Sequence, residues 1–199
     1  GTMEYMAPEV IRGEADPSTE TDLHSLAVLL FNLWCWHHPF HGKMEYELRV
    51  WDIPAKRKVY GNPVFIFDPE DRRNGLPADP DYRTAGERWS YCPQSLRDLF
   101  TRALSEGIRD PRRRVTEGEW QRLFLQLGDG ILPCPKCRAE NIWEPGLEHL
   151  SCWNCQAPIP VPPKLVVATT TGPHHLLLAE GATLSRETLG QGGRDEGSP

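Results

Sequence analysis

Four of the six cysteines fall into two C-x-x-C pairs, and these are the residues whose type and spacing most clearly predict chemistry. Cys134 and Cys137 form the first pair, Cys152 and Cys155 form the second, and fourteen residues separate the two pairs. Each C-x-x-C turn can direct two thiolates at one ion, and four thiolates complete a closed tetrahedral zinc site. Because no ligand position is left for water, the spacing predicts a structural zinc ribbon rather than a catalytic metal site.

The two cysteine pairs have two alternative interpretations besides a zinc site. A rubredoxin-like iron site has compatible spacing and stays open. A redox-active C-x-x-C is disfavoured, because no βαβ pattern surrounds either pair. We expect Trp143 and Trp153 to shield the site rather than to stack on nucleic-acid bases, since residues 131–164 carry three basic and three acidic side chains and gain no net attraction to phosphates.

The remaining cysteines and several histidines show no metal-ligand spacing. Cys35 is predicted to be a small core residue, and Cys92 is an isolated cysteine before a proline. Four histidines are predicted to be turn or surface residues: His37, His38, His174 and His175.

The composition is that of a globular protein. The 199 residues are 39% hydrophobic and 25% charged, which leaves room for one domain of ordinary size and something smaller. The net charge of −6 argues against a nucleic-acid partner, whose binding would depend on basic contacts with phosphates. No signal peptide is visible, and no apolar run reaches the roughly 20 residues that span a bilayer. The sequence therefore predicts a cytoplasmic protein without membrane association.

The stretch Asp22–Trp36 must position much of the chain, because eleven of its fifteen residues are apolar. Apolar residues occur on every face of the predicted helix, which is typical of a helix buried on all sides. Thr19 and Asp22 have the spacing of a capping box at its start, and Pro39 ends it.

The following segment is predicted to be irregular. Met44–Trp51 is a candidate short helix. Gly61–Trp89 is rich in proline, glycine and aspartate, and only Val64–Phe67 is predicted to be extended. A loop of this length is uncommon in a compact domain, so the region about 52–92 is interpreted as an insertion with its own packing.

Two amphipathic helices are predicted next. The first covers Pro93–Leu104, with apolar residues at i, i+3, i+4, i+7 and i+8 from Leu96. The second opens on a capping box of Thr116 and Glu119, carries Trp120 on its apolar face and stops at Gly128.

The composition changes after residue 130. Residues 158–163 (PIPVPP) form a stiff linker, and Lys164–Thr169 and His175–Glu180 are predicted strands of a hairpin. Two strands alone are marginally stable, so they are interpreted as the start of a β unit. The predicted domains are 1–129, 130–158 and 159–189, followed by a disordered tail over 190–199.

The first residues resemble a known family. GTMEYMAPE over residues 1–9 resembles the end of the activation segment of eukaryotic-type Ser/Thr protein kinases, with Ala7, Pro8 and Glu9 as its A-P-E motif. The stretch from Asp22 resembles the D-x-W-S-x-G start of the buried central helix, with His24 in place of Trp and Ala27 in place of Gly. Asp110, Pro111 and Arg114 resemble the D-P-x-x-R turn late in the kinase C-lobe.

The resemblance implies a role for each matching residue. Thr2 would lie in the substrate-binding loop that receives the residue after the phosphorylated hydroxyl. Glu9 and Arg114 would form the ion pair that ties the activation segment to the lobe, and Asp22 would accept backbone N–H groups of the catalytic loop. Taken singly, each residue has a plainer interpretation. Asp22 could be only a helix cap, Arg114 could belong to a solvated basic turn, and Glu9 could be an ordinary exposed carboxylate.

The ATP-handling motifs of a kinase are missing from the sequence. It contains no G-x-G-x-x-G, V-A-I-K, H-R-D-x-x-x-x-N or D-F-G motif, which in kinases precede the A-P-E motif. The chain is therefore interpreted as a C-lobe fragment that is inactive alone, with ATP and Mg²⁺ bound only by the complete kinase. In a complete kinase the catalytic loop would be anchored on helix 22–36. Because this loop is missing from the sequence, we expect part of the apolar surface of the helix to be uncovered.

The predicted architecture is mainly α: kinase-like C-lobe helices, then a four-cysteine zinc ribbon and the start of a β unit. This order resembles bacterial Ser/Thr kinases with a C-terminal zinc ribbon, which implies protein substrates or signalling partners, among them a phosphatase and a von Willebrand A-type protein. The alternative is a non-catalytic kinase-like scaffold that docks partners through the ribbon. A nucleic-acid-binding ribbon protein is disfavoured by the charge.

Overall fold

The computed structural model describes residues 2–169 and 172–178. The chain divides into two compact units, Gly1–Trp120 and Gln121–Pro199. The division falls inside helix α8 (Glu117–Asp129). The domain ranges expected from the sequence remain predictions.

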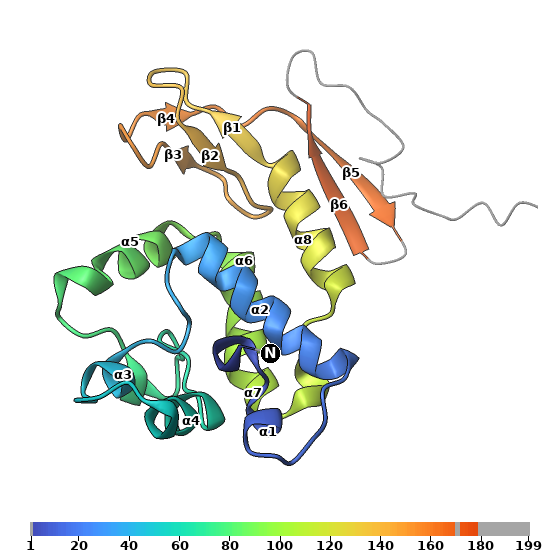
Figure 1. Ribbon diagram of the computed structural model, residues 1–199. Helices are drawn as coiled ribbons and strands as arrows, with labels where there is room; N and C mark the ends of the chain where they lie inside the picture. Colours follow the sequence, from blue (N-terminus) through green and yellow to red (C-terminus); the bar gives the residue numbers. More distant parts are fainter. Residues whose placement is uncertain (1, 170–171, 179–199) are drawn as a thin grey trace, which may run out of the picture. The chain divides into compact units, whose positions relative to one another are not determined.

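The first unit is built from helices (Figure 1). Its longer helices are α2 (Thr19–Cys35), α4 (Ile53–Gly61), α5 (Arg83–Tyr91) and α6 (Gln94–Thr101). Shorter helical turns join them: η1 (Met3–Tyr5), α1 (Pro8–Ile11), α3 (Lys43–Tyr46), η2 (Arg72–Asn74), η3 (Pro80–Tyr82), α7 (Gly107–Arg109) and η5 (Pro111–Arg113). A π-helical segment, η4 (Arg102–Glu106), lies between α6 and α7. The helix-rich architecture agrees with the predicted fold class.

Helix α2 begins three residues before the predicted stretch. Its N-cap is Ser18, whose side chain accepts a hydrogen bond from the Thr21 N–H, while the Thr21 hydroxyl accepts one from the Ser18 N–H at 2.8 Å. This reciprocal pair occupies the capping positions, so the predicted capping box of Thr19 and Asp22 is wrong. The helix ends at Cys35, because Trp36 adopts a left-handed conformation with φ 53° before the expected proline is reached.

The burial of α2 differs from the prediction of a helix covered on every face. One face is fully buried and consists of Thr21, His24, Ala27, Val28, Phe31 and Cys35. On the other side, Leu29 is 45% exposed and Leu33 is 65% exposed. The expectation of burial on all sides is therefore wrong. The second expectation, that part of the apolar surface of this helix is uncovered, is confirmed.

The core of the first unit is organised around Phe31. Its ring lies 5.3 Å from the ring of Phe65 and 5.2 Å from that of Phe100, both in edge-to-face geometry. Trp89 adds a stacked contact with Phe67 at 4.5 Å. Edge-to-face and offset aromatic pairs add stabilisation beyond the burial of their area.

These aromatic contacts correct the prediction for residues 61–89. Val64–Phe67 was expected to be extended, but it forms a turn whose Phe65 and Ile66 are 0% and 3% exposed. Helix α5 was not expected at all. Since Phe65, Phe67 and Trp89 pack on α2 through Phe31, the segment belongs to the common core and does not pack on its own.

The other helix predictions are confirmed with changed ends. The amphipathic pattern from Leu96 is confirmed, because Leu96, Phe100 and Leu104 are fully buried. Its later part, however, is π-helical rather than α-helical. The helix predicted over Met44–Trp51 is reduced to α3. At the start of α8 the Glu119 carboxylate accepts hydrogen bonds from the N–H and the hydroxyl of Thr116, both at 2.9 Å, as the second capping box predicts.

The described part of the second unit carries three small antiparallel sheets, each of two strands (Figure 1). The pairs are β1 (Ile131–Pro133) with β2 (Glu140–Ile142), β3 (Leu150–Ser151) with β4 (Pro158–Ile159), and β5 (Lys164–Thr169) with β6 (Gly172–Leu177). The last pair confirms the predicted hairpin, although its second strand begins three residues earlier than expected. Glu180 and the tail predicted to be disordered, 190–199, lie outside the described residues.

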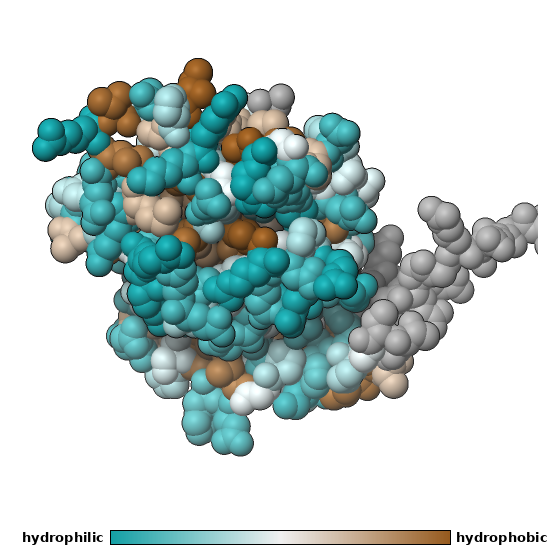
Figure 2. Space-filling view, turned by 90° about the horizontal axis from the view of Figure 1, so that it is seen from below, coloured by the Kyte–Doolittle hydropathy of each residue, from teal (hydrophilic) through white to brown (hydrophobic). Residues whose placement is uncertain are grey.

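The surface carries few continuous apolar regions in the view of Figure 2, where hydrophobic residues form small separate groups among hydrophilic ones. Within the described ranges, no helix has both the length and the apolar character needed to cross a membrane.

Candidate functional site

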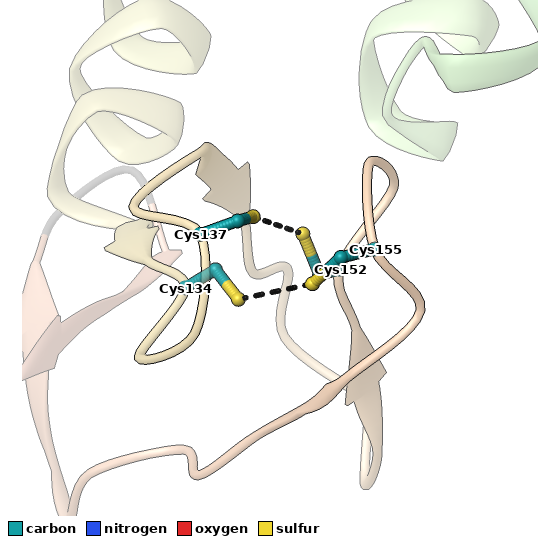
Figure 3. Close-up of side chains that lie close together, drawn as sticks. All are labelled: Cys134, Cys137, Cys152 and Cys155. Atoms are coloured by element: carbon teal, nitrogen blue, oxygen red, sulfur yellow. Dashed lines mark hydrogen bonds between the residues drawn. The ribbon is translucent and has the colours of Figure 1, made fainter.

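The four paired cysteines converge on one point (Figure 3). Their sulfur atoms all lie within 4.8 Å of one another. The Sγ atoms of Cys134 and Cys155 are 3.6 Å apart, and those of Cys137 and Cys152 are 3.5 Å apart. These distances are far longer than a disulfide bond, and the cysteines are free. The cluster can hold a metal ion.

Each cysteine pair is held in a tight turn of the same geometry. The Cys134 N–H donates to the Ala139 carbonyl at 2.8 Å, and the Cys152 N–H donates to the Ala157 carbonyl at 2.9 Å. The residue after each second cysteine adopts a left-handed conformation: Arg138 with φ 65° and Gln156 with φ 59°. This backbone shape turns the chain back, so that both sulfur atoms of a pair face the same side.

Backbone N–H groups stabilise the thiolate form of two of the cysteines, Cys134 and Cys152. Burial by itself would raise the pKa of Cys152, but N–H groups of Cys155 and Asn154 and the neighbouring thiols lower it to about 6. A hydrogen bond from the backbone N–H of Cys137 is the main cause that lowers the pKa of Cys134. At Cys155 a backbone hydrogen bond with Ala157 lowers the pKa, but burial and the neighbouring thiols together raise it to about 11. Thiolates, not thiols, are the ligands of metal ions.

The two tryptophans expected to shield the cluster differ in burial. Trp143 is 3% exposed and belongs to the core around the cysteines, which is completed by Leu132, Cys134, Cys152, Ile159 and Leu177. Trp153 is 50% exposed, although its indole N–H donates to the Glu140 carbonyl at 2.9 Å. The shielding role is therefore filled by Trp143, while Trp153 only covers the edge of the turn.

Sequence reasoning missed Asn141, which lies beside the cluster. Its side chain is 4% exposed, and its amide nitrogen is 3.8 Å from the sulfur of Cys152. No spacing pattern in the sequence marks this asparagine, because its environment depends on how the two cysteine turns come together.

The second candidate site is the ion pair between Glu9 and Arg114, which the structure brings together. The two guanidinium nitrogens of Arg114 bind the two carboxylate oxygens of Glu9 at 2.8 and 2.9 Å. The Arg114 side chain is 2% exposed and that of Glu9 is 15% exposed. A bidentate, charge-assisted pair of this kind is stronger than a single neutral hydrogen bond.

Arg114 uses its remaining donors on the backbone of two further helices. It donates to the Glu20 carbonyl at 3.0 Å and to the Gly107 carbonyl at 3.3 Å. One guanidinium thus joins α1, α2 and α7. Burial raises the pKa of the Glu9 carboxyl, but the hydrogen bond from Arg114, a backbone hydrogen bond and the positive charge of Arg114 together outweigh it and hold the pKa below its usual range.

The neighbouring arginines do form the solvated turn that was the alternative for Arg114. Arg112 is exposed and pairs with Asp110, and Arg113 pairs with Glu106. The three consecutive arginines therefore have different environments, and only the third is buried.

The other residues of the kinase-like motifs differ in exposure. Ala7 is 1% exposed, Pro8 is the first residue of α1, and Thr2 is exposed before η1. Asp22 is exposed in the first turn of α2, where acidic side chains are favourable.

Histidines contribute to the interior more than the sequence suggested. His24, at the position where the kinase pattern has Trp, is 2% exposed and stacks on Phe40 at 5.8 Å. Burial and the charge of Arg114 lower its pKa to about 4. His38 was expected at a turn or surface, but it is 8% exposed and binds the Glu4 carbonyl at 2.9 Å. That expectation is wrong, because the loop after α2 turns inward and the His38 ring packs edge-to-face against Phe40 of the same loop.

Comparison with known proteins found a family match that covers the first unit. The family model described as "Protein kinase domain" matches residues 1–124. No curated protein and no solved structure matches the chain. The matched segment contains the A-P-E residues, helix α2 and the turn that carries Arg114, and it covers more than half of the sequence. The chain therefore belongs to the protein kinase domain family.

Proposed function

We propose that the protein containing this chain is a Ser/Thr protein kinase, which transfers a phosphoryl group from ATP and Mg²⁺ to serine or threonine hydroxyls of protein substrates. The observation that carries the proposal is the buried bidentate ion pair between Glu9 and Arg114. It ties the A-P-E segment to the lobe, and a fixed segment after the catalytic residues is what a kinase needs to hold a protein substrate. The Ser/Thr type is supported by the pattern from Thr2 to Glu9.

The 199 residues alone are predicted to be inactive. Phosphoryl transfer requires groups that bind the nucleotide, hold Mg²⁺ and orient the substrate hydroxyl, and their motifs are absent from this sequence. Within the chain, Thr2 is proposed to contact the substrate, whereas Ala7, Pro8, Glu9, Asp22 and Arg114 are proposed to hold the lobe in its active shape.

The experiment is a phosphotransfer assay on the product of the complete reading frame, followed by identification of the phosphorylated amino acids. Phosphoserine or phosphothreonine is expected, and a Glu9→Gln variant should lose most of the activity. Phosphotyrosine as the main product would contradict the Ser/Thr type. The purified 199-residue chain is the matched control, and phosphotransfer by it would contradict its predicted inactivity.

We further propose that the four cysteines hold a structural zinc ion. A tetrahedron of sulfurs about 2.3 Å from zinc has edges of about 3.8 Å, close to the two sulfur–sulfur distances of 3.5 and 3.6 Å. When bound, zinc would fix the two turns relative to each other and leave no open position for chemistry. This ribbon is the feature that resembles bacterial kinases with a C-terminal zinc ribbon.

Metal analysis of freshly purified chain tests the zinc proposal. One equivalent of zinc is expected, and Cys134→Ser should abolish its retention, whereas Cys92→Ala should not. Iron in place of zinc would support the rubredoxin-like alternative, and no metal at all would contradict the site.

The alternative function is a non-catalytic scaffold that docks partners through the ribbon. It is favoured by the departures His24 and Ala27 from the kinase pattern and by the missing ATP-handling motifs. The complete reading frame separates the two functions, since H-R-D-x-x-x-x-N and D-F-G motifs there would favour the enzyme. A phosphatase and a von Willebrand A-type protein are the partners proposed in either case, in the cytoplasm.

A further inference from the structure

The two halves of the cysteine cluster are copies of one structural pattern, displaced by 18 residues. Cys134 and Cys137 correspond to Cys152 and Cys155. The backbone hydrogen bonds correspond as well: the residue after each second cysteine donates its N–H to the carbonyl of the first, at 3.0 Å in one half and 2.9 Å in the other. The strands also agree, because β1 pairs with β2 in the register in which β3 pairs with β4.

One buried position breaks this repeat. In the second half it is Ile159, which is 6% exposed and pairs with Leu150. In the first half it is Asn141, which is 4% exposed and pairs with Leu132. An apolar residue therefore suffices to fill this position in one half. A buried amide in the other half costs free energy unless its polar atoms are satisfied, so it calls for a polar role.

The amide of Asn141 is used on both of its polar atoms. Its nitrogen donates to the Ala139 carbonyl at 2.7 Å and points its second hydrogen toward the Cys152 sulfur, 3.8 Å away. Its oxygen accepts from the backbone N–H of Trp153 at 3.0 Å. Ala139 belongs to the first cysteine turn, while Cys152 and Trp153 belong to the second. The side chain therefore bridges the two turns independently of any metal.

We propose that Asn141 is a positioning residue of the metal centre: it fixes the second cysteine turn against the first and donates an N–H to the Cys152 thiolate. The inference rests on the proposed metal site. Four thiolates around a divalent ion carry a net negative charge, which an N–H donor stabilises. Groups that orient metal ligands in this way typically change metal affinity by about 10- to 100-fold when they are replaced.

Two variants of the complete 199-residue chain separate this role from simple packing. Asn141→Ile gives the first half the residue that the second half already has. Asn141→Asp keeps the shape but places a carboxylate oxygen against the sulfur and the Ala139 carbonyl. Asn62→Asp is the matched control, because it makes the same chemical change at an exposed position of the first unit, outside the cysteine turns.

Zinc affinity is measured by competition with a chromophoric chelator. Both Asn141 variants should bind zinc about 10- to 100-fold more weakly than the wild type. The Asn62→Asp control should change the affinity by less than about threefold, because the position is exposed and solvent screens its charge. Equal affinities of Asn141→Ile and the wild type would overturn the inference.

A cobalt-substituted chain provides a readout that packing does not affect. An N–H donor to a thiolate lowers the energy of the sulfur lone pairs, so its loss should move the sulfur-to-cobalt charge-transfer band of Asn141→Ile to lower energy. An unchanged band would overturn the N–H donation even if the affinity fell. Failure of the wild-type chain itself to bind zinc or cobalt would overturn the metal site, and is distinguishable because it does not depend on residue 141.

Discussion

The two units of the chain are stabilised by different means. The first has an aromatic core in which Phe31 contacts Phe65 and Phe100, and a buried ion pair joins three of its helices. The second has strands of two to six residues and a core that includes two of its four clustered cysteines. A core that small provides little stability without a cross-link or a metal. The contrast leads us to expect that the second unit depends on its metal for stability and that the first unit does not.

The largest expected effect is that of metal removal, and it should be confined to the second unit. Structural zinc contributes on the order of 10 kcal/mol in small zinc-dependent folds. Stripping the metal with a chelator should therefore unfold residues 130–178 and leave the first unit folded. Amide hydrogen exchange followed by mass spectrometry measures both units in one experiment. Loss of protection around Phe31 on metal removal would contradict the proposed independence.

The next largest effect is expected at the ion pair of the first unit. Removing either partner leaves a buried or half-buried group without its counter-charge, which typically costs about 3–5 kcal/mol. Glu9→Ala and Arg114→Ala should each lower the free energy of unfolding strongly, and the double variant should cost less than the sum. Urea unfolding with a double-mutant cycle measures this coupling. Additive effects would contradict the pair, and Arg112→Ala, at an exposed neighbour, is the control.

A smaller effect is expected from pH, and again in the first unit. The pKa of His24 is about 4 in the folded protein and about 6.5 in an unfolded chain, so between these values the unfolded state binds more protons. The contribution of His24 to the free energy of unfolding should therefore be fully present above pH 6.5. It should fall by roughly 3 kcal/mol as the pH drops toward 4. His24→Phe preserves the stacking on Phe40 and should remove the part of this dependence that is due to His24. A part due to His38, whose pKa burial lowers to about 3, should remain in both proteins. Urea midpoints at pH 7 and pH 4.5 test it, and parallel losses in both proteins would argue against His24.

The smallest effect is expected on the exposed side of α2. Leu33 is 65% exposed, so Leu33→Ser should change the stability of this chain by less than about 0.5 kcal/mol. Val28→Ala, on the buried face of the same helix, should cost about 1–3 kcal/mol. Thermal unfolding of the two variants compares them. A large loss for Leu33→Ser would mean that this side of the helix is covered after all.

Local patterns in the sequence predicted the features that depend on spacing. The cysteine cluster follows from the two C-x-x-C pairs, whereas the contact of Glu9 with Arg114 was expected from the resemblance to protein kinases. The one-sided burial of α2 could not be read from its composition, since apolar residues on all faces do not tell which neighbours are present. The capping box was misplaced by one residue, because Ser18 and Thr21 compete with Thr19 and Asp22 at the same spacing.

Residues that act through long-range packing were harder to predict. Helix α5 is polar and contains a glycine, so its sequence does not favour a helix strongly, and its position is fixed by the contacts of Trp89 with Phe67 and Phe31. Val64–Phe67 has the composition of a strand, but the segment turns so that the rings of Phe65 and Phe67 contact Phe31 in the core. Asn141 was missed because its role appears only when the two cysteine turns are superimposed.

The contacts of the two units join residues at very different separations in the sequence, and this difference affects the order in which the units fold. The pair of Glu9 and Arg114 joins residues 105 positions apart, whereas Cys134 and Cys155 are 21 positions apart. The entropy lost on closing a loop grows with its length, and chains with distant contacts fold more slowly. Refolding should therefore show a fast phase that requires metal and a slower phase that does not. The metal-dependent region would be assembled first, although it is synthesised after the first unit.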